Sequence, residues 1–153
     1  IGEAMNHEHY LQIAEKVAIL GRCKRRQIGC VLVDSSGDIL SDGWNGPPNN
    51  MKSCFESPCE GADVPAGMGA TQKVACMGVH AEIAALLKTN AKDVFGVYSN
   101  KAPCQNCVLT LLNTNCRRIV FRTASNDTKN CELWESAGRE WIHLPGCGLV
   151  GPR

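Results

Sequence analysis

Two short segments about 20 residues apart carry candidate metal ligands at predicted helix starts, and this pairing constrains the fold most strongly. Cys104 and Cys107 follow Pro103 at helical spacing, so both thiols lie on one face of a helix. The N-terminal end of a helix also favours thiolates. His80 opens another predicted helix after a loop. The fold must therefore bring two helix starts together for the three side chains to share one ion.

These three side chains match the ligand set of a catalytic zinc, which keeps a fourth position for water and lowers its pKa. Glu82 follows His80 by two residues and can move protons without binding the metal. Cys-x-x-Cys alone also fits a redox pair or half a zinc finger, and a lone histidine is often structural. A catalytically dead module that kept zinc only for structure would be free to lose Glu82, so the presence of Glu82 favours an enzyme.

Hydrophobic periodicity predicts alternating helices and strands. The apolar spacing over 7–20 predicts a helix that Gly21 ends. The later elements are expected as strands at 28–33, 39–44, 95–99, 118–122 and 141–144 and helices at 81–88, 104–113 and 130–137. This order implies an α/β domain with a mixed sheet of about five strands and helices on both faces.

The chain is expected to form a single domain over 1–153, with a cysteine-containing insert at about 45–79. Its 10 cysteines raise the alternative of a disulfide-stapled secreted domain. The length of the chain and the lack of a recognisable export signal count against that alternative. Cys30 and Cys116 fit ordinary buried apolar positions.

A formal net charge of +1 is too balanced for a protein that binds nucleic acid mainly by neutralising many phosphates. A small substrate with one phosphate stays compatible with it. No apolar run reaches about 18 residues, the length that would predict a membrane span. We therefore expect no nucleic-acid or membrane partner and a cytoplasmic location.

The sequence resembles the cytidine deaminase-like superfamily, and within it the deoxycytidylate deaminases, over about residues 7–144. The resemblance is carried by residues 28–33, 43–46, 80–82 and 103–107, and the pattern His-x-Glu with Pro-Cys-x-x-Cys is typical of zinc nucleobase deaminases. It implies a three-layer αβα sandwich around a central mixed five-stranded sheet. It also implies hydrolysis of dCMP to dUMP and ammonia, a C–N bond hydrolysis that supplies dUMP for thymidylate synthesis.

Other branches of the superfamily fit less well. Relatives that act on free cytidine usually carry cysteine where His80 stands, and riboflavin-pathway relatives space their two cysteines further apart. A tRNA adenosine deaminase-like enzyme shares the metal-site residues but needs a basic surface to hold RNA. A preference for dCTP over dCMP stays open.

The resemblance also assigns substrate contacts. Arg25, or alternatively Arg26, matches a phosphate clamp, since arginine offers paired hydrogen bonds to phosphate. Asn45 matches a contact to a sugar hydroxyl, and Ala81 lies between the metal ligand and the proton carrier. The alternatives are a solvated charge run over 24–26 and an ordinary turn residue at position 45.

The loop at Asn45, Gly46 and Pro47 resembles the segment where many dCMP deaminases bind regulatory nucleotides. There dCTP activates and dTTP inhibits, with Mg²⁺ on the triphosphate, and the enzymes are commonly hexamers. Bacterial relatives often carry a Tyr-Arg pair after the fourth strand, where this chain has Ser125 and Asn126. The resemblance therefore does not carry that regulatory relay, or its share of the phosphate contact, over to this chain.

A second, structural zinc is also expected from the resemblance, because the spacings of Cys23 and Cys54 match a subset of dCMP deaminases. Together with Cys59 and Cys76 they offer four thiolates, which would brace the stretch from 45 to 79. The alternative is a set of buried free thiols.

Overall fold

The computed structural model describes residues 2–58 and 78–146. Within these ranges the helices and strands follow the predicted order, and a short 3₁₀ helix, η2, is added before the third strand. Their bounds are α1 (Gly2–Ala18), β1 (Gly29–Val33), β2 (Ile39–Trp44), α2 (Ala81–Leu86), η2 (Ala91–Asp93), β3 (Gly96–Lys101), α3 (Gln105–Leu112), β4 (Arg118–Thr123), α4 (Lys129–Ser136) and β5 (Glu140–His143).

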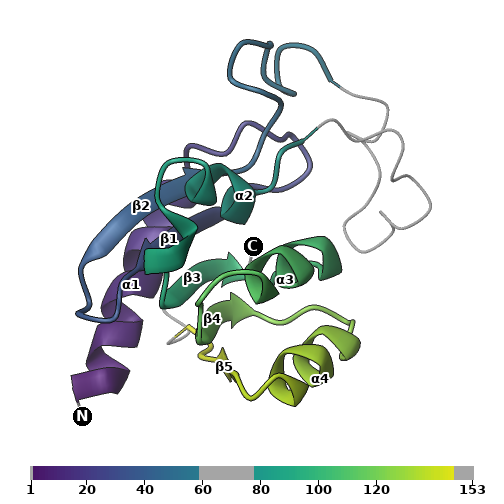
Figure 1. Ribbon diagram of the computed structural model, residues 1–153. Helices are drawn as coiled ribbons and strands as arrows, with labels where there is room; N and C mark the ends of the chain where they lie inside the picture. Colours follow the sequence, from purple (N-terminus) through teal and green to yellow (C-terminus); the bar gives the residue numbers. More distant parts are fainter. Residues whose placement is uncertain (1, 59–77, 147–153) are drawn as a thin grey trace.

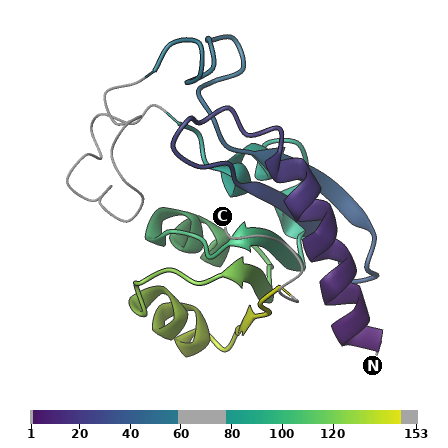
Figure 2. The same ribbon diagram turned by 180° about the vertical axis from the view of Figure 1, so that it is seen from behind.

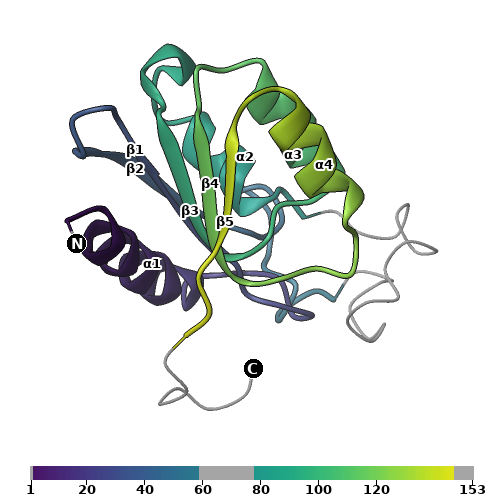
Figure 3. The ribbon, with the colours of Figure 1, turned by 90° about the horizontal axis from the view of Figure 1, so that it is seen from below.

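The strands form one mixed sheet in the order β2-β1-β3-β4-β5. β1 pairs antiparallel with β2 and β3, whereas β3, β4 and β5 run parallel. Helix α1 crosses the sheet on the side that faces the viewer in Figure 2, and α2, α3 and α4 lie on the other side (Figures 1 and 3). This arrangement confirms the three-layer αβα sandwich with a central five-stranded sheet.

Strand residues alternate between the two faces, as the period of a β-strand requires. Leu32 and Val97 join the core cluster under α2, α3 and α4, whereas their neighbours Val31 and Tyr98 join the cluster against α1. Both faces of the sheet are therefore covered. This explains why β1 is buried at every position and reads as a continuous apolar run.

Two glycines allow a helix to approach each face of the sheet closely. A Cβ atom on Gly29 would lie 2.2 Å from the carbonyl oxygen of Ala14 in α1. A Cβ atom on Gly43 would lie 2.3 Å from the carbonyl oxygen of Ala81 in α2. Side chains at these positions would push the helices away, so Gly43 sets how close α2 and its N-terminus come to β2.

Most predicted boundaries differ by one or two positions from those observed, but the first helix differs more. It begins at Gly2 rather than His7 and ends at Ala18 rather than Leu20. The apolar spacing starts at Leu11 and therefore does not report on the earlier turns. Leu20, which extends the apolar pattern, is exposed and lies past the end of the helix.

The two ends of the predicted insert meet. Gly46 and Val79 form an isolated antiparallel bridge, with N···O distances of 3.1 and 2.7 Å. This bridge brings the end of β2 beside the residue that precedes His80. Cys59 and Cys76 lie outside the described residues. Within the described ranges, no helix combines the length and apolar character needed to cross a membrane.

Candidate active site

His80 and Cys104 occupy equivalent positions, each directly before a helix. His80 is the N-cap of α2 and Cys104 is the N-cap of α3, both with extended backbone angles. Neither side chain caps its own helix by a hydrogen bond. Both are therefore free to face the space between the two helix starts, and Cys107 joins them from the first turn of α3.

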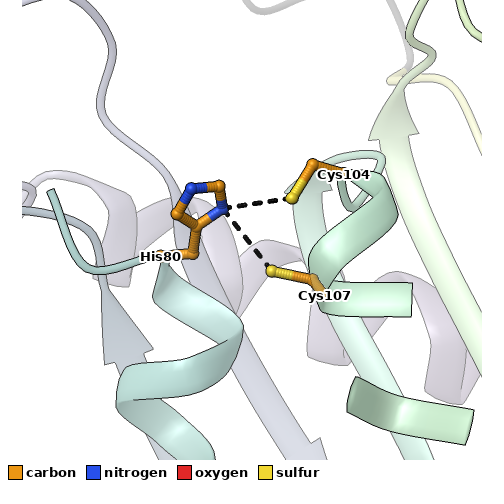
Figure 4. A group of neighbouring side chains, drawn as sticks. All are labelled: His80, Cys104 and Cys107. Carbon is orange, nitrogen blue, oxygen red and sulfur yellow. Dashed lines mark hydrogen bonds between the residues drawn. The ribbon is translucent and has the colours of Figure 1, made fainter. Parts of the chain in front are cut away.

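The three side chains converge on one point (Figure 4). The Nδ1 atom of His80 lies 3.4 Å from Sγ of Cys104 and 3.5 Å from Sγ of Cys107. One donor atom from each residue lies within 4.8 Å of the other two. The cluster runs from the exposed His80 to the buried Cys107, so it lies at the edge of the core.

This geometry fits zinc. Nitrogen and sulfur ligands of a tetrahedral zinc at its usual bond lengths lie roughly 3.6 Å apart, close to the observed separations. One imidazole and two thiolates are also typical zinc donors. Three protein ligands leave a fourth position for water or substrate. Among the described residues, no other group of three or more histidine, cysteine or acidic side chains has such spacing.

The thiols of Cys104 and Cys107 interact strongly, because a hydrogen bond joins them. A hydrogen bond from Cys107 stabilises the Cys104 thiolate and lowers the pKa of Cys104 to about 4. The same interaction, together with burial, raises the pKa of Cys107. The hydrogen bond with Cys104 also raises the pKa of His80. The two sulfur atoms thus share one proton. A metal ion that binds both thiolates displaces that proton.

Glu82 lies in the first turn of α2 and is only 3 % exposed. Burial raises the pKa of its carboxyl group, while a hydrogen bond from its own backbone and the charge of His80 act in the opposite direction. The Cys107 thiol also interacts with this carboxyl group. A buried carboxyl group of raised pKa beside the ligand cluster has the properties of a proton carrier.

The predicted substrate-binding residues lie at the start of α2, at the end of β2 and in the segment that enters β1. Arg25 and Arg26 are partly buried in the segment that enters β1. The pKa of His80 is raised overall, and the charge of Arg26 is the smallest of the effects on it and acts to lower it. Ala81 is buried at the start of α2. Asn45 is nearly buried, and its amide bonds to the backbone of Arg26 and Ile28 at 2.9 Å each. The structure thus gives Asn45 a structural task that its sequence position does not reveal.

The predicted regulatory residues line a separate pocket of about 410 Å³. None of the three metal-ligand candidates contributes to its wall. The pocket is lined by Arg22, Gly43, Trp44, Asn45, Gly46, Pro47, Pro48, Asn49, Val79, Ala84, Leu87 and Lys88.

Two of the four cysteines predicted to bind a second zinc lie within the described residues. Cys54 is buried and Cys23 is partly buried. The backbone N–H of Cys54 donates to the carbonyl oxygen of Arg22 at 2.9 Å, which brings Cys54 beside the residue next to Cys23. The predicted buried thiols Cys30 and Cys116 are fully buried.

Sequence patterns did not single out Asn100 and Lys101, which end β3 shortly before Cys104. Asn100 bonds to the backbone of Gln27 and Gly29, in the segment that enters β1. The available signal was their position, since both directly precede the Ala-Pro-Cys run of residues 102–104.

Comparison with known proteins places this site in a family. A family model described as the cytidine and deoxycytidylate deaminase zinc-binding region matches residues 4–123. The deoxycytidylate deaminase of Schizosaccharomyces pombe is 27% identical over 134 residues, covering 85% of this chain and 41% of that protein. This chain therefore spans less than half of the yeast protein. The deoxycytidylate deaminase of Mycobacterium phage D29 is 30% identical over 121 residues, covering 74% of this chain and 91% of the phage protein.

Solved structures agree on the fold. A crystal structure of dCMP deaminase from the cyanophage S-TIM5, in complex with dCMP and dUMP, superposes with a TM-score of 0.71 at 22% identity. The match covers 90% of this chain and 95% of the phage chain. With a family match over most of the chain and a His-Cys-Cys cluster in place, this chain belongs to the cytidine and deoxycytidylate deaminase zinc-binding family.

Proposed function

We propose that this chain hydrolyses dCMP to dUMP and ammonia. The observation that carries the proposal is the cluster of His80, Cys104 and Cys107 with the buried Glu82 beside it. The similarity to yeast and phage proteins named deoxycytidylate deaminase supports dCMP as the substrate.

Glu82 carries the protons of this reaction. Its carboxylate accepts a proton from the attacking water and delivers it to the ring nitrogen next to the reacting carbon. A second proton transfer converts the amino group into ammonia, which leaves as the carbonyl of dUMP forms. Burial keeps the Glu82 carboxyl group away from bulk water and raises its pKa, which suits a group that must both accept and donate a proton.

His80, Cys104 and Cys107 would hold zinc, which supplies a Lewis acid able to make water nucleophilic near neutral pH. Arg25, or alternatively Arg26, and Asn45 lie where the segment entering β1 meets the end of β2. We assign the arginines to the substrate phosphate and Asn45 to the sugar. The amide nitrogen of Asn45 keeps a second hydrogen for that contact.

Ammonia release tests the proposal. The purified zinc-loaded protein is incubated separately with dCMP, dCTP, deoxycytidine and tRNA. We expect turnover of dCMP and much weaker release from the other three. Faster release from dCTP would identify a dCTP deaminase, and release only from tRNA would identify an RNA-editing enzyme. No release from any substrate would contradict the proposal.

The pocket beside Asn45, Gly46 and Pro47 is assigned to a regulatory nucleoside triphosphate with Mg²⁺, with dCTP activating and dTTP inhibiting. Its lining includes two cations: Arg22, whose guanidinium donates to the carbonyl oxygens of Pro47 and Pro48, and Lys88, which pairs with Asp42 at 3.1 Å. The same ammonia assay with dCMP, with and without Mg²⁺ and dTTP, tests this assignment. Turnover that dTTP leaves unchanged would remove the regulation and keep the enzyme. The remaining predictions are a second zinc at Cys23, Cys54, Cys59 and Cys76, hexameric assembly, a role in supplying thymidylate synthesis and a cytoplasmic location.

A further inference from the structure

Two cationic residues, Arg26 and Lys101, lie on neighbouring segments that hydrogen bonds of Asn100 join, and Lys101 precedes Cys104 by three residues. Lys101 is the last residue of β3 and lies shortly before Cys104 in the sequence. Arg26 lies in the segment that enters β1. The charge of Arg26 acts on both Lys101 and His80. Both of these groups are therefore within its electrostatic reach, although they belong to different elements.

Asn100 builds this proximity into the fold. Its Nδ2 atom donates to the carbonyl oxygen of Gln27 at 3.1 Å, and its Oδ1 atom accepts from the backbone N–H of Gly29 at 3.0 Å. From the end of β2, the amide of Asn45 donates to the carbonyl oxygen of Arg26 at 2.9 Å. Asparagines from two strands thus hold the segment of Arg26 against the end of β3 that carries Lys101.

Strand geometry assigns Lys101 to the face of the sheet that carries the metal ligands. Residues two apart on a strand share a face, so Lys101 lies on the same side as Val97. Val97 packs in the core cluster that contains Ala81 of α2 and Val108 of α3. His80 and Cys104 are the N-cap residues of these two helices.

The arrangement is electrostatically costly. Burial and the charge of Arg26 lower the pKa of Lys101, and burial and the charge of Arg25 lower that of Arg26, with the Cys23 thiol offsetting a part. Within residues 2–58 and 78–146, neither the Arg26 nor the Lys101 side chain has a carboxylate or hydrogen-bond partner. Like charges held together partly out of water are unfavourable unless an anion joins them.

We propose that Lys101 and Arg26 form one anion site that binds the phosphate of the nucleotide substrate, with Lys101 as a substrate-binding residue. Arginine supplies paired hydrogen bonds to phosphate and lysine a compact charge. The identity of the nucleotide rests on the proposed deaminase function, whereas the anion site follows from the geometry and charges.

Three variants test the role of Lys101. Lys101→Ala removes the charge, Lys101→Arg keeps it, and Lys92→Ala removes an exposed lysine from η2, at the other end of β3. Because a hydrogen bond to a charged group is lost, kcat/KM for dCMP should fall roughly 10- to 100-fold in Lys101→Ala. The value for deoxycytidine, which has no phosphate, should stay within about twofold of wild type for a contact made only to phosphate. Lys101→Arg should recover most of the activity, and Lys92→Ala should match wild type.

An equal loss on both substrates would overturn the proposal by showing a structural role, and an unchanged kcat/KM for dCMP would overturn it directly. Titration with inorganic phosphate, followed by ³¹P NMR, separates this site from the proposed reaction. We expect Lys101→Ala to weaken phosphate binding at least tenfold relative to wild type and Lys92→Ala. Lys101-dependent phosphate binding without dCMP turnover would keep the anion site and reject the deaminase. Turnover of dCMP, with neither kcat/KM nor phosphate binding sensitive to Lys101, would keep the deaminase and reject the anion site.

Discussion

The side-chain amide of Asn45 donates a hydrogen bond of 2.9 Å to the backbone carbonyl oxygen of Arg26. The oxygen of the same amide accepts from the backbone N–H of Ile28, also at 2.9 Å. One side chain at the end of β2 therefore satisfies two backbone groups in the segment that enters β1. This arrangement couples the stability of the fold to the position of a cation beside the ligand cluster.

Asn45→Ala should reduce both stability and activity. It leaves two partly buried backbone groups without partners, which costs about 1–3 kcal/mol in the free energy of unfolding. Urea denaturation measures this loss, and Asn45→Asp, which keeps only the acceptor, should also destabilise the protein. If Asn45→Ala lowers dCMP turnover while the urea midpoint stays at the wild-type value, Asn45 serves the substrate alone.

Glu82→Gln should retain the fold and the zinc but lose turnover. The amide has nearly the same shape as the carboxyl group but cannot carry protons, so kcat for dCMP should fall by roughly 10²- to 10⁴-fold. Glu132→Gln is a matched control, because Glu132 also lies in the first turn of its helix but is exposed. Steady-state kinetics and metal analysis check both variants. Turnover at the wild-type rate in Glu82→Gln would remove Glu82 from the mechanism.

Metal analysis of protein purified without chelators should find two zinc ions per chain. Cys104→Ser should remove one ion and abolish activity, because it deletes a ligand of the catalytic site. Cys54→Ser should remove the other ion and leave residual activity. Cys131→Ser, on α4, should change neither the zinc content nor the activity. One ion per chain in the wild-type protein would eliminate the second site.

The two close helix–sheet contacts should respond differently to an added methyl group. Gly43→Ala forces α2 away from β2, and Gly29→Ala forces α1 away from β1. Each should cost about 1–3 kcal/mol in the free energy of unfolding. Only Gly43→Ala should also weaken zinc binding, because His80 is the N-cap residue of α2.

Chelator competition measures that zinc affinity. Gly146→Ala is the control, since no atom lies within 4 Å of the added Cβ atom. Equal zinc affinities in Gly43→Ala and Gly29→Ala would show that the position of α2 does not control the metal site.

Much of the fold and of the ligand cluster could be predicted from local patterns. The apolar run of β1 is buried at every position because helices cover both faces of the sheet. Cys104 and Cys107 share a helix face by their spacing alone. The first helix was less predictable, because its N-terminal turns lie outside the apolar spacing that begins at Leu11.

Sequence by itself determined the chemistry of the ligand set, the order of the elements and the family, because each depends on residue type and short-range spacing. Tertiary structure decided which distant groups meet. It paired β1 with β3, engaged the amide of Asn45 with the backbone, and brought Arg26 within electrostatic reach of Lys101. These contacts depend on how strands and loops far apart in the sequence pack together, and no local spacing encodes that packing.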